Sequence, residues 1–496
     1  DVDQAFYGDE SSEEINPNKQ LTDESITDNA TIANWIMTFS EHYLAYKFVT
    51  DSQANVRLLL LDRSLSIERA SLLYDTSRPD FWKTKSNIRG YEVDGAPIDD
   101  NELAMARQCV CNQALNLPPS RADYLIHAVT YLAEQKKSLT EKQVLSELGI
   151  ADDKRAKRVG RALKTLVRRG VLCEEDESYI LNSKYTATRE RTRKLVTELG
   201  ERFFFNKTEN PMKIIKDGKE HWLTTLDIAF LTLFTLHLLM EECWKKHILI
   251  IGITKDTAAR DFKRQLVPIM HNKGLLKTTI SQEAFAALPN TDRMILQSAS
   301  MLNTDKVEPP WSLIEYDSAF RTMIPDRQKR KDYVSGAIKN RITLERTFLK
   351  TYVQLSQAKT DPLLRSNVLL IDRLVYPEYD YKPENVVTFL SEFGGAVEPV
   401  EVVLYKDKAV SNRLQNLVMT VLVAMAPLSI PEAFGHNKPL FIADKIAKWN
   451  YGQFKCIVDT TAGWILNNHK LRRFIFYMST FRERRASVEA ARRENI

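Results

Sequence analysis

The chain has 496 residues, of which 44% are hydrophobic and 27% are charged, so it can form two or three domains with real cores. Its net charge of +5 is small for this length. This excludes a polybasic coat for nucleic acid, and any nucleic-acid contact must use locally clustered cations. Five scattered cysteines exclude a disulfide framework and favour a reducing, cytoplasmic compartment.

The first part of the chain predicts a polar lead-in followed by a helix and a strand. Residues 1–29 are acidic and lack an apolar core, so we expect partial disorder and no signal peptide. Ala30–Phe48 has apolar residues at helical spacing, which predicts a helix. The apolar run Val56–Asp62 ends in an acid and predicts a strand buried on both faces. We assign residues 30–120 to the first part of an α/β core.

Residues 121–186 differ in character and predict a separate module. A helix at Tyr124–Gln135 is followed by LTEKQVLSELG, with Thr140 as its N-cap, and then by a basic helix that stops at Gly170. The segment VLCEEDESYILN then predicts a two-stranded hairpin with an acidic turn. Three helices followed by a hairpin resemble the winged-helix arrangement.

The basic helix of this module is the strongest sign of DNA binding. Arg161, Lys164 and Arg168 share one face by helical spacing, Arg158 lies on the same helix, and Leu163 belongs to the apolar face. A helix that enters a major groove, with phosphate contacts from its flanks, has this pattern. The alternative is a solvated helix in a module that contacts other proteins.

The remainder of the α/β core is expected over residues 187–470. The apolar stretch Leu226–Met240 is too short for a membrane span and predicts a helix buried in the core, so no membrane is implied. The pattern predicts three more strands and four helices. The strands are His247–Thr254, Thr347–Leu355 and Asn367–Leu374, and the helices are Ala258–Met270, Glu384–Phe393, Lys408–Met425 and Pro439–Lys448.

Residues 471–496 predict a basic C-terminal helix. This basic segment includes the aromatic residues Phe474, Phe476, Tyr477 and Phe481, so stacking on single-stranded DNA is one interpretation. The other is an amphipathic helix that docks on a partner or on a second subunit.

Four residues are candidates for chemistry. Asp62 ends an apolar strand, where a carboxylate can reach solvent and a hard cation such as Mg²⁺ or Mn²⁺. Glu41 lies on the preceding helix and could face Asp62. His436 lies in a glycine-containing loop, and Asp444 lies in the helix that follows it. Taken singly, each also has a structural explanation as a loop, cap or surface residue.

In this order the segments resemble the NurA nuclease family, partners of the HerA DNA translocase. The Glu41 helix followed by LLLLDRSLS is similar to the family's Glu-bearing helix and Asp-Gly-Ser-Leu strand end. HILIIGITKDTAARDF is similar to its strand ending in Gly-Ile-Ser-Lys. PEAFGHNKPLFIADKIAKW resembles its C-terminal loop and helix. Together these stretches span about residues 30 to 450.

The resemblance implies a metal site. It makes Glu41 and Asp62 ligands of Mn²⁺ or Mg²⁺, and it makes Lys255 a phosphate contact. His436 stands where the family has Tyr and could act as acid or base, Asp444 stands where it has His, and Arg63 replaces its Gly. The family's first motif, Asp-Gly-Ser at a strand end, has no counterpart before Glu41. Either the sequence starts after that strand or the site is incomplete.

The resemblance also implies a fold and a function. The expected fold is an RNase H-like α/β nuclease core with the winged helix inserted in it. The expected protein is a metal-dependent deoxyribonuclease, of the single-strand endonuclease or 5′–3′ exonuclease type. It would act as a homodimer on a HerA-like hexameric ATPase in DNA end resection, repair or defence. The alternative is a non-catalytic DNA-binding adaptor that keeps the fold. A winged-helix transcription regulator would explain residues 122–184 alone.

Overall fold

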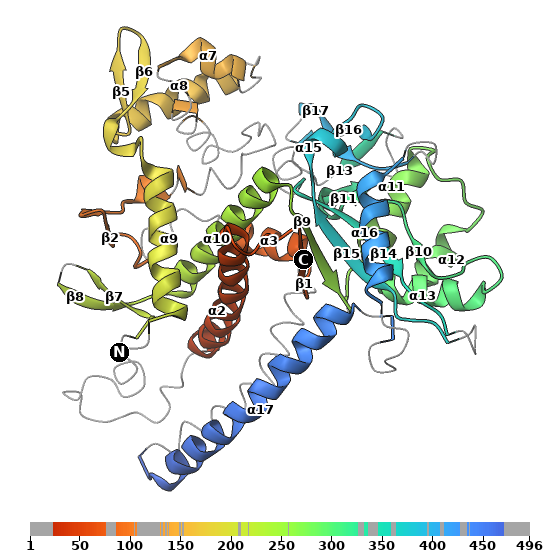
Figure 1. Cartoon of the computed structure of the whole chain (residues 1–496). Coiled ribbons are helices and arrows are strands. Elements are labelled where there is room, and N and C mark those ends of the chain that lie inside the picture. The colour runs from red at the N-terminus through yellow and green to blue at the C-terminus, as the bar shows by residue number, and fades with distance from the viewer. Residues whose placement is uncertain are drawn as a thin grey trace.

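A computed structural model describes most of the chain as a mixed α/β fold (Figure 1). The described residues are 23–75, 86–103, 105–106, 129, 132–133, 136, 138–147, 150, 153–206, 210–216, 218–255, 257–325, 332–335, 346–358, 364–393, 396–406, 411–426, 434–435 and 437–470. The expected lead-in before Asp23 and the expected C-terminal helix at 471–496 lie outside them.

Two long helices form the centre of the helical part of the fold. α2 (Asp23–Thr50) packs along α10 (Thr225–Lys246), as Figure 1 shows. α10 begins with a capping box, in which the Thr224 hydroxyl accepts from the Asp227 amide and the Asp227 carboxylate accepts from the Thr224 amide. Every residue from Leu226 to Met240 is buried, which confirms the expected core helix.

Two further helices, α3 (Leu65–Asp75) and α9 (Thr188–Phe204), contact this pair. The described helices include none that is both long enough and apolar enough to cross a membrane.

The main sheet is mixed. Its strand order is β1-β9-β15-β14-β10, and β11 also pairs with β14. β1 and β9 are parallel, and the other neighbours are antiparallel. The strands are β1 (Leu58–Leu61), β9 (Leu249–Thr254), β10 (Trp311–Ser312), β11 (Tyr316–Asp317), β14 (Phe348–Gln354) and β15 (Leu369–Leu374).

The sheet confirms three of the expected strands and corrects one detail of the fourth. β9, β14 and β15 lie where the sequence predicts them and are almost entirely buried. β1 also forms, but it is only half-buried. Among the described strands it pairs with β9 alone and lies at the sheet edge, so the expectation of burial on both faces is wrong.

Alternate residues of these strands pack on opposite faces of the sheet. Ile251, Ile253 and Ile371 point to the face covered by α16 (Arg413–Ala424) and the first turn of α17 (Lys438–Asn467). Tyr352 and Leu370 point to the opposite face. This division follows from the two-residue period of a strand.

The predicted helix at Glu384–Phe393 is wrong, because this segment is the strand β16 (Val386–Phe393). It pairs with β17 (Ala396–Val403) in a second sheet of order β12-β13-β16-β17. Val387 and Phe389 are buried and Thr388 between them is exposed, which is the period of a half-buried strand. The other two strands are β12 (Ile324–Pro325) and β13 (Tyr333–Ser335).

The helix expected at Ala258–Met270 begins later than predicted. The chain forms a π-helical turn, η2 (Phe262–Leu266), and then α11 (Val267–Asn272). The start is set by Asp292, whose carboxylate accepts from the amides of Phe262 and Lys263, both at 2.9 Å. Nearby elements are α12 (Gln282–Ala287), α13 (Asp292–Leu302) and η3 (Ser318–Thr322).

A small module with its own core lies apart from the main sheet (Figure 1). Its described elements, in chain order, are β4, α7, α8, β5 and β6, and its sheet order is β4-β6-β5. Thr140 caps α7 as expected, because its hydroxyl accepts from the Gln143 amide. The bounds are β4 (Leu139–Thr140), α7 (Glu141–Glu147), α8 (Asp153–Arg168), β5 (Leu172–Glu175) and β6 (Ser178–Leu181).

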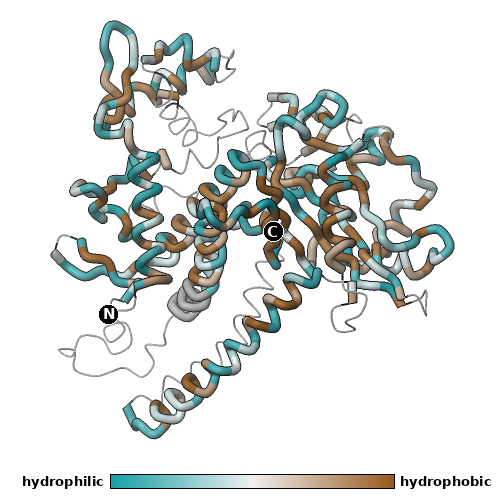
Figure 2. Tube along the Cα trace, viewed as in Figure 1, coloured by the Kyte–Doolittle hydropathy of each residue, from teal (hydrophilic) through white to brown (hydrophobic). Residues whose placement is uncertain are grey.

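The last described helix, α17, projects from the sheet, and Figure 2 shows apolar and polar residues mixed along it. The predicted helices Lys408–Met425 and Pro439–Lys448 are thus confirmed as α16 and α17, the latter far longer than expected. The remaining elements are β2 (Glu92–Val93), β3 (Ala96–Pro97), β7 (Lys213–Lys216), β8 (Lys219–Trp222), η1 (Ser183–Tyr185) and α15 (Pro377–Asp380).

Candidate functional site

Asp62 and Lys255 lie at the same edge of the main sheet. Asp62 directly follows β1, and Lys255 directly follows β9. These strands are parallel, with Leu61 opposite Gly252, so their carboxyl ends meet. Both side chains are exposed. This edge is therefore open to solvent and carries one acid and one cation.

Asp444 belongs to the same neighbourhood. Asn437 caps α17 by accepting from the Leu440 amide, and Asp444 lies one turn after Leu440. A hydrogen bond from Lys448, at 2.6 Å, lowers the pKa of Asp444, and the charge of Lys255 contributes to the same shift. His436, in the loop before α17, lies outside the described residues.

Glu41 forms an ion pair with an arginine, Arg63. The Arg63 guanidinium forms ion pairs with Glu41 and with Glu68, the latter at 2.5 Å. Burial by itself lowers the pKa of Arg63, but the charges of Glu68 and Glu41 outweigh it and raise the pKa. His42, which is buried, pairs with the second carboxylate of this network, Glu68. Glu41 therefore faces the guanidinium of Arg63. At the position of Arg63 the family that the sequence resembles has a glycine.

The described residues do not assemble a metal-ligand set. None of their His, Cys, Asp and Glu side chains form a group of three that could hold a metal ion. Asp62 and Lys255 follow neighbouring strands, Asp444 interacts with Lys255, and Glu41 is paired with Arg63. The predicted pair of Glu41 and Asp62 therefore does not fit Mn²⁺ or Mg²⁺ on these residues alone, and we derive no catalytic step from it.

A buried carboxylate that the sequence did not single out fixes the turn after Asp62. Asp372 of β15 accepts hydrogen bonds from the Ser64 hydroxyl at 2.7 Å and from the Ser66 amide at 2.9 Å. Gly252 lies beside it in the sheet, where a Cβ would approach Asp372 Oδ1 to 2.1 Å. Burial raises the pKa of Asp372. It therefore positions the start of α3.

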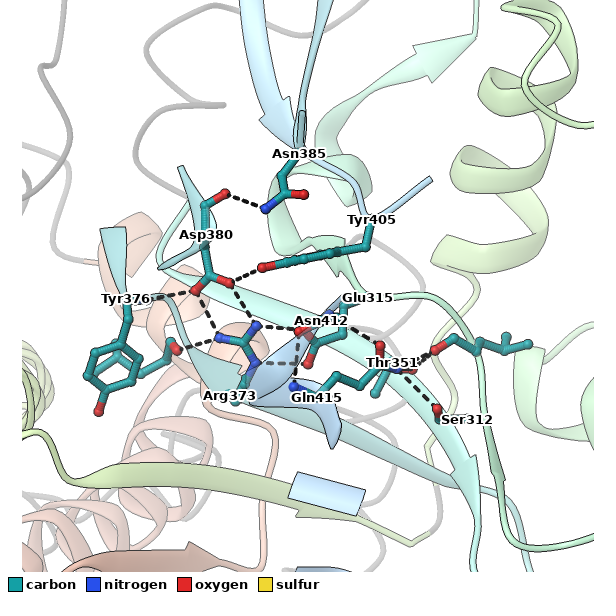
Figure 3. Close-up of polar contacts among 12 residues, drawn as sticks. Ser312, Glu315, Thr351, Arg373, Tyr376, Asp380, Asn385, Tyr405, Asn412 and Gln415 are labelled. Atoms are coloured by element: carbon teal, nitrogen blue, oxygen red, sulfur yellow. Dashed lines mark hydrogen bonds and ion pairs between the residues drawn. The ribbon is translucent and has the colours of Figure 1, made fainter. Parts of the chain in front are cut away.

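A second buried polar network is centred on the next residue of β15, Arg373, whose side chain points to the opposite face of the sheet from Asp372 (Figure 3). The Arg373 guanidinium donates to Glu315 at 2.9 and 2.6 Å and to Asp380 at 2.9 and 2.8 Å. Tyr405 donates to Asp380 at 2.6 Å, and Asn412 donates to Glu315 at 2.8 Å. All five side chains are buried or nearly so. This network is structural, because its donors and acceptors satisfy one another.

The module presents a basic face on α8. Arg158, Arg161, Lys164 and Arg168 are exposed, and none of them forms an ion pair with another described residue. The opposite side of α8, including Leu163, is buried in the core of the module. The four cations therefore have no partner among the described residues and are available to a ligand.

The neighbouring hairpin has the opposite charge. The turn between β5 and β6 contains Asp176 and Glu177, both with positive φ, and Glu174 and Glu175 precede it. These acids are exposed. A polyanion is therefore attracted to α8 and repelled by the tip of the hairpin.

Comparison with known protein families, with curated protein sequences and with solved structures finds no match to this chain.

Proposed function

We propose that this protein binds DNA through the exposed basic face of α8. The observation that carries the proposal is the set of four exposed cations at Arg158, Arg161, Lys164 and Arg168, which pair with no described residue and lie on a helix whose other side is buried. Phosphates recruit such cations, and base edges in a major groove accept from arginine. The order β4, α7, α8, β5, β6 supports a winged-helix arrangement with α8 as its recognition helix.

The salt dependence of DNA binding tests this proposal. Each phosphate contact adds about 0.9 to the slope of log affinity against log salt. We expect Arg161→Ala/Arg168→Ala to weaken binding to labelled duplex DNA and to reduce the slope by about 2. The matched control is Lys277→Ala/Lys306→Ala, which removes two exposed cations elsewhere. Equal affinity and slope in both double variants would assign α8 to a protein partner.

A metal-dependent deoxyribonuclease is the second candidate. It is supported by the resemblance to NurA nucleases and by the common sheet edge of Asp62 and Lys255, with Asp444 close to Lys255. This candidate includes an RNase H-like core, a homodimer, a HerA-like translocase partner and a cytoplasmic location. A nuclease site would require metal ligands beyond the described residues, because Glu41 forms an ion pair with Arg63.

A cleavage assay separates the two candidates. Purified protein is incubated with Mn²⁺ or Mg²⁺ and labelled single- and double-stranded DNA, with and without a translocase partner. The nuclease predicts cleavage that is lost in Asp62→Asn and kept in Glu92→Gln, a control at an exposed acid. Binding without cleavage under every condition would favour the non-catalytic DNA-binding adaptor.

A further inference from the structure

The exposed side of α8 carries a row of hydrogen-bond donors. Lys157, Arg161, Lys164 and Arg168 are exposed and follow one face of the helix at spacings of four, three and four residues. At the rise of an α-helix this row is about 17 Å long. Ammonium and guanidinium groups donate hydrogen bonds and accept none. The row therefore suits phosphate oxygens and the acceptor atoms of guanine, but it leaves the amino groups of adenine and cytosine unbound.

α8 lacks the neutral side chains that read A·T base pairs. Its sequence contains no asparagine, glutamine or serine. The hydroxyl of its one threonine, Thr165, donates to the Arg161 carbonyl at 2.8 Å within the helix. Leu163 and Leu166 are buried in the core of the module, so they do not reach the methyl group of thymine. Asp153 is an acceptor, but it lies in the first turn, where its charge complements the helix dipole.

An arginine that bonds guanine does not by itself define a sequence. The N-terminal residues of a recognition helix reach the base edges, and among the described side chains Arg158 is the arginine nearest that end of α8. Guanine occurs every few base pairs in DNA of mixed sequence, so a single contact of this kind selects no site. Arg161 and Arg168 lie further along the helix, where phosphate contacts are expected.

The hairpin of the module lacks the side chains that read the minor groove. β5 and β6 are joined by the two-residue turn Asp176-Glu177, whose φ values of 45° and 61° are those of a tight turn. Its tip exposes four consecutive acids, residues 174–177. Residues 172–181 contain no arginine, lysine, asparagine or glutamine, the side chains that make minor-groove contacts. The phosphates that border the groove therefore repel the tip.

We infer that the α8 module binds duplex DNA of any sequence. The inference rests on the proposed DNA binding and specifies it: α8 contacts phosphates along its row of cations, and the hairpin stays out of the minor groove. Neither α8 nor the hairpin carries the set of side chains that distinguishes one sequence from another. The free energy of binding then comes from phosphate contacts and counterion release, which do not depend on sequence.

Binding to unrelated duplexes tests this inference. The full chain is titrated against three labelled duplexes of unrelated sequence, equal length and equal G·C content, with EDTA present so that no metal-dependent cleavage occurs. We expect dissociation constants that agree within about threefold, whereas a sequence-specific protein prefers its site by roughly 10³–10⁷. Selection from a random-sequence duplex library should enrich no motif.

The same duplexes test the row of cations. Arg161→Ala/Arg168→Ala should weaken binding by the same factor on all three, because a phosphate contact is lost equally on every sequence. The control Lys277→Ala/Lys306→Ala removes two exposed cations elsewhere and should leave all three affinities unchanged. A loss that differs between the duplexes by more than about threefold would mean that one of the two arginines reads a base, and the inference would be wrong.

Neutralising the tip of the hairpin tests its place outside the groove. Asp176→Asn/Glu177→Gln removes two acids from the tip, and the control Asp305→Asn/Glu308→Gln removes two exposed acids elsewhere. At low salt we expect the first variant to bind every duplex at least about threefold more tightly than the control, because it removes repulsion close to the DNA. Equal affinities would mean that the tip does not face the duplex, and weaker binding would mean that its acids contact the bases. Either result would contradict this part of the inference.

The measurements also separate the inference from the proposed function. If no duplex binds, the proposed DNA binding is itself wrong. If binding occurs but the three dissociation constants differ by more than about threefold, or the selection enriches a motif, only the inference is overturned.

Discussion

Asp292 shows how burial at a single residue links stability to pH. It begins α13, where its carboxylate accepts from the Tyr352 hydroxyl at 2.7 Å and from two backbone amides. Burial outweighs these hydrogen bonds and raises its pKa from 3.8 to about 6. Because the folded protein holds this proton more tightly than the unfolded chain, its contribution to stability is complete below about pH 4. It is lost as the pH rises through 6.

Between pH 4 and 6 the folded protein holds the Asp292 proton, whereas the unfolded chain releases it. We therefore expect Asp292→Asn to abolish this difference of one bound proton between the two states. Over this range the free energy of unfolding should decline more steeply in the wild type than in the variant, by up to about 1.4 kcal/mol per pH unit. Urea denaturation at pH 4, 5, 6 and 7 measures this difference. Asp305→Asn, at an exposed acid, is the control. Parallel pH profiles for wild type and Asp292→Asn would contradict the assignment.

At the scale of elements, two glycines in regular structure have opposite roles. Gly252 lies within β9, where a Cβ would come within 2.1 Å of Asp372 Oδ1 and 2.5 Å of the Arg63 carbonyl. Gly452 lies within α17, where an added Cβ meets no atom within 4 Å among the described residues. The first allows β1, β9 and β15 to pack closely, and the second only weakens a helix.

Alanine at these two positions should separate the roles. We expect Gly252→Ala to destabilise the protein by about 1–3 kcal/mol or more, because Asp372 or the turn at Arg63 must move. Gly452→Ala should stabilise α17 by about 0.5–1 kcal/mol. Thermal denaturation measures the first effect, and hydrogen exchange in α17 measures the second. A well-tolerated Gly252→Ala would show that the sheet edge is not tightly packed.

At the scale of the whole molecule, Asp99 joins the α8 module to the rest of the fold. Its carboxylate accepts from Lys184 Nζ at 2.5 Å and from the Tyr185 hydroxyl at 2.9 Å. Tyr185 in turn is part of the core of the module. Burial raises the pKa of Asp99, but the hydrogen bonds, that from Lys184 foremost, outweigh it and lower the pKa. The junction is therefore held by a charged acceptor.

We expect Asp99→Ala to loosen this junction. Loss of the acceptor should lower the free energy of unfolding by about 1–3 kcal/mol and speed hydrogen exchange around Tyr185. The neighbouring Asp100→Ala removes an exposed ion pair with Arg89 and should cost less than about 1 kcal/mol. If both variants behave alike, the junction depends on apolar packing and not on Asp99.

The local pattern of apolar residues predicted the helices and strands well where a single helical or strand period dominates the sequence. The buried helix α10 and the strands β9, β14 and β15 follow from apolar runs, and α8 follows from its helical spacing, because each of these signals lies within a few residues. The prediction of a helix at β16 was wrong, since the identity of this segment as a strand depends on its pairing with β17.

The candidate site was less predictable. Asp62 after an apolar strand, and its place beside Lys255, could be inferred from the sequence, because parallel strands bring their carboxyl ends to one edge. The partner of Glu41 could not, since the side chains of α2 and the turn after β1 meet only in the folded chain. Asp372 and Asp292 were not singled out either, because their burial depends on residues more than 25 positions away.

The sequence by itself determined the composition of the elements: an apolar strand that ends at Asp62, a basic helix with one buried side, and a core helix at 226–240. Only the tertiary structure decided which charges meet. It paired Glu41 with Arg63, placed Asp372 under the start of α3, and left the cations of α8 exposed. The reason is physical: periodicity acts over a few residues, whereas ion pairs and burial depend on contacts between distant parts of the chain.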